Sequence, residues 1–143
     1  MRDLHHDFKP VVSLYPLLIL AIQDGDAIID LQGYEGALII VTAGAIADGS
    51  GAVTLYTFEL KHGDIANLSD AVAVPAADLL GSEPSFEAIT GATHEENESK
   101  SFGYIGAKRY LRVDLVAVPT VPGVGGTFSG IVVKGHPRHA PVV

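Results

Sequence analysis

The stretch RYLRVDLVAV, residues Arg109–Val118, decides the fold class. Apolar residues take every second position in it: Leu111, Val113, Leu115 and Ala117. A period of two places successive side chains on opposite faces of a β-strand. The stretch therefore predicts a strand with one apolar face. Arg112 and Asp114 face the other way, where Arg112 can form an ion pair within the chain or with a neighbouring chain.

Other stretches carry the same kind of signal. Residues Ala52–Leu60, AVTLYTFEL, alternate and place Tyr56, Phe58 and Leu60 on one face. Residues Glu35–Thr42, EGALIIVT, are apolar on both faces, which is typical of a central strand that is buried on both sides. Shorter strands are expected in three further stretches: Ala27–Leu31, Phe102–Ile105 and Thr127–Lys134.

Glycine and proline separate these stretches, with 16 and 8 residues respectively. Turns are expected at Ala43–Gly51, at Lys61–Asp64 and around Gly123–Gly126, and Pro75 interrupts the middle of the chain. Roughly six to eight short strands between such turns predict an all-β fold. We expect a jelly-roll-like antiparallel β-sandwich with extended N- and C-terminal segments.

A length of 143 residues predicts one domain. We divide the chain into an N-terminal arm or first-strand segment (1–26), a β-sandwich domain (27–134) and a C-terminal tail (135–143). The first part contains the apolar run VVSLYPLLILAI, Val11–Ile22. This run lacks a signal-peptide cleavage pattern and is shorter than the about 20 apolar residues that span a bilayer. It is expected to pack on its own core or on a neighbouring subunit, and no membrane partner is predicted.

The composition excludes several classes of site. The chain has no cysteine, so disulfides, zinc–thiolate sites, iron–sulfur clusters and a cysteine nucleophile are ruled out. The net charge is −8 and the nine Lys and Arg residues are spread along the chain, so no nucleic-acid partner is predicted. Hydrophobic residues make up 48% and charged residues 18%, which argues against a disordered chain.

The sequence carries no motif for catalysis or for a cofactor. Its serines lie in no G-x-S-x-G turn, and the glycine-rich segments 49–51 and 123–126 lack the spacing of phosphate-binding loops. Residues Asp24–Asp30, DGDAIID, begin like a calcium loop but lack its central glycine and distal glutamate. We therefore expect a non-enzymatic protein without a cofactor.

The last ten residues, KGHPRHAPVV, contain His136 and His139. Two ligands at this spacing can bind a metal ion from one face of a helix. Two prolines in the same segment disfavour a helix, and in an extended chain the two side chains point to opposite sides. No metal site is predicted. We expect His136, Arg138 and His139 to donate hydrogen bonds at a subunit contact instead.

Lys108 and Arg109 are the two adjacent basic residues of the chain, and Arg112 follows them closely. On an acidic protein, such residues suit docking to an acidic partner surface. We include all three among the candidate contacts with a second subunit or a capsid. An ordinary exposed strand face explains them equally well.

Four phrases occur in a recognisable order. They are IDLQGYEGALIIVTAG (Ile29–Gly44), PAADLLG (Pro75–Gly81), GYIGAKRYLRV (Gly103–Val113) and GHPRHAP (Gly135–Pro141). An opening VVSLYP, Val11–Pro16, precedes them. As a set that spans nearly the whole chain, they resemble a family of small proteins encoded among the head genes of tailed bacteriophages and prophages.

The resemblance implies a virion protein, made in the host cytoplasm, that decorates the outer surface of an HK97-like phage head as a cement protein. Its implied partners are the phage major capsid protein and further copies of itself in a homotrimer. The family has no agreed catalytic residues, so none are transferred. Tyr15 and Pro16 in the opening join the candidate subunit or capsid contacts. The apolar run after them and the acidic loop around Glu95–Glu98 depart from the family pattern.

Two alternative functions stay open. A head-completion, neck or tail protein is also structural and would differ in its copy number per virion. A carbohydrate-binding jelly-roll module belongs to another class, and it would show a groove lined by aromatic residues such as Tyr56, Tyr104 or Tyr110. We rank this alternative below the structural ones, because the chain has no tryptophan and only 7% aromatic residues.

Overall fold

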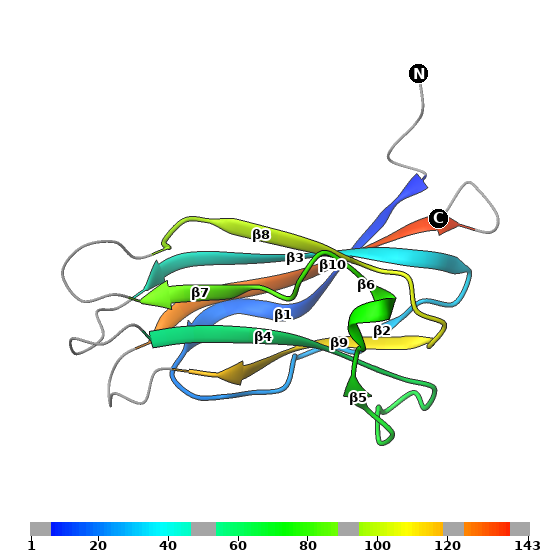
Figure 1. The fold of residues 1–143 in the computed structure, drawn as a ribbon, viewed down its shortest axis with the longest axis horizontal. Helices are drawn as coiled ribbons and strands as arrows, with labels where there is room; N and C mark the ends of the chain where they lie inside the picture. The colour runs from blue at the N-terminus through cyan, green and yellow to red at the C-terminus, as the bar shows by residue number, and fades with distance from the viewer. Residues whose placement is uncertain (1–6, 47–53, 89–94, 119–124, 138–143) are drawn as a thin grey trace.

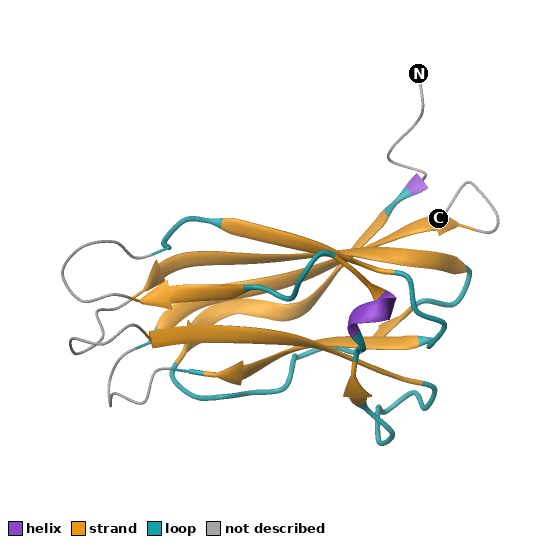
Figure 2. Cartoon of the chain, in the orientation of Figure 1, coloured by secondary structure: helices purple, strands orange, loops and turns teal. Residues whose placement is uncertain are grey.

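The computed structural model describes residues 7–46, 54–88, 95–118 and 125–137, and these fold into two antiparallel β-sheets (Figure 1). Sheet A contains, in spatial order, β1 (Lys9–Ile19), β10 (Gly126–Pro137), β3 (Tyr34–Ile46), β8 (Ser99–Tyr104) and β6 (Leu79–Leu80). Sheet B contains β2 (Ile29–Asp30), β9 (Tyr110–Ala117), β4 (Thr54–Gly63) and β5 (Val72–Ala73), and β7 (Ser85–Ala88) also pairs with β4. A single 3₁₀ turn, η1 (Ala76–Asp78), precedes β6 (Figure 2).

The core lies between the two sheets, where aromatic rings from both meet. Phe58 of β4 lies 5.2 Å from Phe128 of β10 and 5.9 Å from Phe86 of β7, measured between ring centroids. These three rings and Tyr56 are all at most 1% exposed. Burying each such side chain contributes about 1.5–3 kcal/mol, so this cluster is a main source of the sandwich's stability.

The predicted all-β antiparallel sandwich is confirmed, as is the shared inward face of Tyr56, Phe58 and Leu60. The jelly-roll connectivity stays a prediction. Two turn predictions are partly wrong, because β3 continues to Ile46 and β4 to Gly63. Long-range pairing explains both extensions: the end of β3 pairs with Phe128 and Gly126 of β10, and the end of β4 pairs with β9.

The apolar run near the N-terminus belongs to the sandwich of its own chain. β1 pairs with β10, and its Leu14 and Ile19 are buried in the core. Pro10 and Pro16 are tolerated because β1 is an edge strand, where a missing N–H need not break a ladder. At the other end, Gly135–Pro137 of the predicted tail continue β10. No helix among the described residues is long and apolar enough to cross a membrane.

Candidate interaction surface

Arg112 is engaged within the chain. Its guanidinium contacts both carboxylate oxygens of Asp114 at 2.6 and 2.9 Å, and Asp24 at 3.0 Å. Asp114 lies on the outer side of β9 as predicted, yet it is only 3% exposed. The segment before β2 covers it, and the backbone N–H of Gly25 donates to Asp114 Oδ1 at 2.8 Å. The within-chain form of the predicted ion pair is therefore the one observed.

Lys108 and Arg109 lie together in the loop between β8 and β9, and each also has a carboxylate partner. Arg109 donates two hydrogen bonds to Asp30, at 2.8 and 2.7 Å, and one to Gln32 at 2.6 Å. Lys108 forms an ion pair with Asp64. The Arg109 guanidinium lowers the pKa of the Asp30 carboxyl, so this pair stays ionised well into the acid range. The local positive charge is thus largely compensated within the chain.

This loop forms one wall of an open cleft of about 470 Å³. The other wall is the β2–β3 turn, Leu31–Glu35. The cleft is lined by polar side chains that already bind each other, such as Arg109 and Gln32. Such a lining does not present converging, unpaired catalytic groups.

A buried pair that the sequence analysis did not identify supports this loop. His62 Nδ1 lies 3.1 Å from the hydroxyl of Tyr104, which also accepts the backbone N–H of Lys108 at 3.0 Å. Burial lowers the pKa of His62 and raises that of Tyr104. A Cβ on Gly106 would lie 2.6 Å from the Tyr104 hydroxyl oxygen, so this position requires glycine. The network is structural, and no local motif marked it.

The remaining predicted contacts lie apart from this loop. Tyr15 and Pro16 are exposed in a bulge of β1, between the pairs Leu14–Gly130 and Leu17–Phe128. His136 is exposed near the end of β10. Arg138 and His139 lie outside the described residues. Within the described ranges, no group of three or more His, Asp and Glu side chains could hold a metal ion.

The aromatic groove of the carbohydrate-binding alternative is contradicted at two of its three residues. Tyr56 is 0% exposed and Tyr104 is 1% exposed, so neither can stack on a sugar. Both point inward because they occupy core-facing positions of β4 and β8. Tyr110 is half-buried, with the Arg109 guanidinium 5.0 Å from its ring centroid.

The outer face of sheet B is charged. Glu59 and Lys61 of β4 point outward and pair in register with Asp114 and Arg112 of β9. Lys61 Nζ and Glu59 Oε2 are 2.5 Å apart. Polar side chains at outward positions are typical of an antiparallel sheet that has one face in water.

The outer face of sheet A differs, because none of its outward strand positions within 10–12, 36–42, 99–103 and 127–133 carries a charge. We call it the uncharged face. Its apolar members are Val12, Leu38, Ile40, Leu80, Ile131 and Val133. Its small members are Thr42, Ser99, Ser101, Gly103 and Ser129. Leu38 is 44% exposed and Leu80 is 58% exposed, so a large apolar area meets solvent.

The small residues of this face carry a hydroxyl group or no side chain at all. The hydroxyls of Thr42 and Ser129 lie 2.7 Å apart and bond to each other across β3 and β10. Leu80 lies over Gly103, where an added Cβ would come within 3.1 Å of the leucine side chain. The signal for this face was already present in EGALIIVT, Glu35–Thr42, whose apolar residues on both faces predicted burial on both sides. In the single chain, the inner face of this strand is buried, while Leu38 on the outer face is exposed and Ile40 and Thr42 are partly exposed.

A comparison of the chain with protein-family models, curated proteins and solved structures finds no match in any of the three.

Proposed function

We propose that this chain is a non-enzymatic structural protein of a tailed-phage virion, a decoration protein on the outer surface of an HK97-like head. The observation that carries the proposal is the uncharged face, a sheet surface that exposes Val12, Leu38 and Leu80 on a protein with a net charge of −8. Such a surface suits a subunit that works by being covered in an assembly.

The polar groups of the chain support a structural role. Arg109 and Arg112 are each held by carboxylates of the same chain. The buried His62 is bonded to Tyr104 beneath the loop that lines the cleft and is not itself among the lining residues. An enzyme would instead direct such groups toward a substrate.

The mechanism of stabilisation is linkage between binding and shell integrity. A protein that buries surface only on the assembled head shifts the equilibrium toward the intact capsid. Apolar area contributes about 25 cal/mol per Å² buried, so even a few hundred Å² per copy is a substantial contribution when many copies bind. The major capsid protein is the proposed partner, and the trimer that the resemblance implies is part of the same proposal.

The test mixes the purified chain with undecorated shells assembled from the major capsid protein of the same phage. Co-sedimentation measures binding, and light scattering during heating measures the disruption temperature of the shells. We expect saturable binding and a higher disruption temperature. A chain that neither sediments with the shells nor changes this temperature is not a decoration protein. A chain that binds only the neck or tail of virions would favour the head-completion alternative.

A further inference from the structure

We propose that the uncharged face of sheet A packs against the same face of a second copy of this chain, as a two-fold dimer. The inference rests on the proposed function, since it takes the uncharged face to be an assembly surface, and it names the partner of that face.

Charge selects the partner. A surface carrying Lys, Arg, Asp or Glu would have to bury those charges against Leu38, Ile40 and their neighbours without a counter-charge. Each such burial costs several kcal/mol. A suitable partner surface must therefore be free of charge as well. Among the described residues, the outer face of sheet B fails this requirement because Glu59, Lys61 and Arg112 lie on it. The uncharged face of another copy meets it.

The polar atoms of the face do not oppose this contact. Buried hydroxyls cost free energy when they lose water without gaining a partner. Thr42 and Ser129 already bond to each other at 2.7 Å, so covering them leaves that bond intact and one remaining hydroxyl proton for the second copy or water to accept. Ser99 and Ser101 lie on β8, nearer the edge of the sheet, where water or the second copy can reach them.

The area is sufficient for a specific contact. Four strands spaced at 4.8 Å make the face about 20 Å wide, and the seven residues 36–42 of β3 at 3.4 Å each make it about 24 Å long. This gives on the order of 500 Å² per copy and 1,000 Å² for a pair, about the least that a specific interface buries. Two β-sheets can also pack face to face, at a separation of about 10 Å.

Symmetry favours a pair over a ring at this surface. A two-fold axis lets one patch serve both copies, because the patch contacts itself. A trimer built by rotation needs two different complementary patches on each chain. The face-to-face contact therefore differs from the trimer contact that the resemblance implies, and the two can be separated by measurement.

Two leucines of equal exposure provide a matched test. Leu38 lies on the uncharged face and is 44% exposed, while Leu55 of β4 lies on the outer face of sheet B and is 42% exposed. We would compare the full chain with Leu38→Lys and Leu55→Lys by sedimentation equilibrium over a range of concentrations. Thermal unfolding of each variant checks that it folds. We expect the unchanged chain and Leu55→Lys to dimerise, and Leu38→Lys to raise the dimer dissociation constant at least tenfold.

The inference is wrong if the unchanged chain is monomeric. It is also wrong if the chain forms a trimer and the Leu38→Lys variant still forms that trimer. Val12→Asp, on the same face, is the second variant and decides the question if Leu38→Lys does not fold. The shell-binding experiment is run in parallel with the same variants. If the unchanged chain is monomeric and Leu38→Lys abolishes its binding to shells, the face contacts the capsid. That result contradicts the dimer and supports the proposed function. If the chain forms a dimer that depends on Leu38 but binds no shell, the dimer stands and the proposed function fails.

Discussion

Arg112 and Asp114 stand two residues apart on β9 and form a forked ion pair, with Nε 2.6 Å from Oδ1 and Nη2 2.9 Å from Oδ2. Their side chains share the outer side of the strand because of its two-residue period. Asp114 Oδ1 also accepts the backbone N–H of Gly25 at 2.8 Å. The pair thereby ties the segment between β1 and β2 to β9 of sheet B.

Replacing Asp114 by alanine should destabilise the fold by about 2–4 kcal/mol, because it leaves a largely buried guanidinium and a backbone N–H without their partner. The matched control is Asp24→Ala, since the Asp24 side chain is 73% exposed and also contacts Arg112. That change should cost less than about 1 kcal/mol. Urea unfolding measures both. If both variants lost the same free energy of unfolding, the buried carboxylate of Asp114 would contribute no more than the exposed one of Asp24.

The two fully buried tyrosines should respond in opposite ways to loss of the hydroxyl. Tyr104→Phe leaves the N–H of Lys108 and the ring nitrogen of His62 without a partner, at a cost of about 1–3 kcal/mol. The Tyr56 hydroxyl is buried and has no hydrogen-bond partner among the described residues. Tyr56→Phe should therefore be neutral or stabilising. Thermal unfolding compares the variants, and faster amide hydrogen exchange at Lys108 should appear only in Tyr104→Phe.

His62 should make stability depend on pH in the weakly acid range. Burial holds the pKa of His62 below its usual value, and the nearby Lys108 lowers it further while Asp78, Asp64 and Asp70 oppose the shift. Below pH about 6.5, the unfolded chain binds a proton that the folded chain resists. The stability contribution of neutral His62 is thus present above pH 6.5 and is lost as the pH falls toward the folded-state pKa.

The check for His62 is the difference in unfolding free energy between the unchanged chain and His62→Gln, measured by urea unfolding from pH 5 to pH 8. The difference should shrink as the pH falls. A pH-independent difference for His62→Gln would contradict the prediction.

Local patterns predicted the strands whose alternation is complete. Arg109–Val118 became β9, and the inward face of Tyr56, Phe58 and Leu60 is buried as expected. The end of β3 was missed because AGAI resembles a turn locally and becomes a strand only through its partners on β10. His62 was missed for the same reason, since its partner Tyr104 lies 42 residues away.

The sequence carried a signal for the uncharged face, but that signal was interpreted as burial within one domain. The apolar residues on both faces of Glu35–Thr42 predicted a strand covered on both sides. Within one chain the prediction holds for the inner face, with Ile39 and Val41 at 0% exposure, and fails for Leu38. A single sequence cannot distinguish burial inside a domain from burial between molecules, because both require the same apolar side chains. The ion pairs of the basic residues could not be predicted, since their carboxylate partners come from distant segments such as Asp30 and Asp64.

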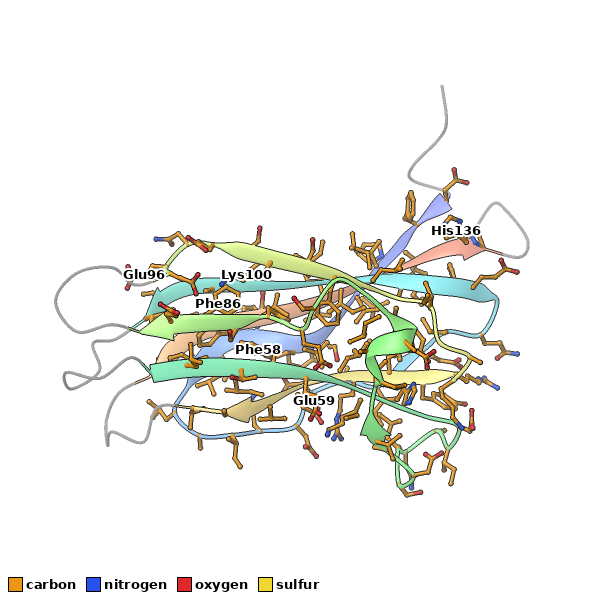
Figure 3. All side chains as sticks on the ribbon, viewed as in Figure 1. Phe58, Glu59, Phe86, Glu96, Lys100 and His136 are labelled. Atoms are coloured by element: carbon orange, nitrogen blue, oxygen red, sulfur yellow. The ribbon has the colours of Figure 1, made fainter. Side chains whose placement is uncertain are left out.

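Lys100 closes one edge of the sandwich and provides the last prediction. It comes from β8 of sheet A, and its ammonium group lies 2.7 Å from the carbonyl oxygen of Ser85 on β7 of sheet B. It also lies 2.7 Å from Glu95 Oε1 and 4.7 Å from the centroid of the Phe86 ring; Figure 3 labels Lys100 and Phe86 at this edge. The hydrogen bond from Lys100 holds the pKa of Glu95 below its usual value. One cation therefore joins the two sheets.

Lys100→Met keeps an aliphatic stem over Phe86 but removes these polar bonds, so we expect a loss of about 1–2 kcal/mol. Lys61→Met is the control, because Lys61 pairs with Glu59 of the same strand and joins no two sheets; its cost should stay below about 0.5 kcal/mol. The Lys100–Glu95 contribution is present above the unfolded-state pKa of Glu95 and is lost as the pH falls through the folded-state pKa. Urea unfolding at pH 7 and at pH 3 should therefore show a smaller effect of Lys100→Met at the lower pH. Similar losses for both lysines would show that the contact between the sheets adds nothing beyond a surface ion pair.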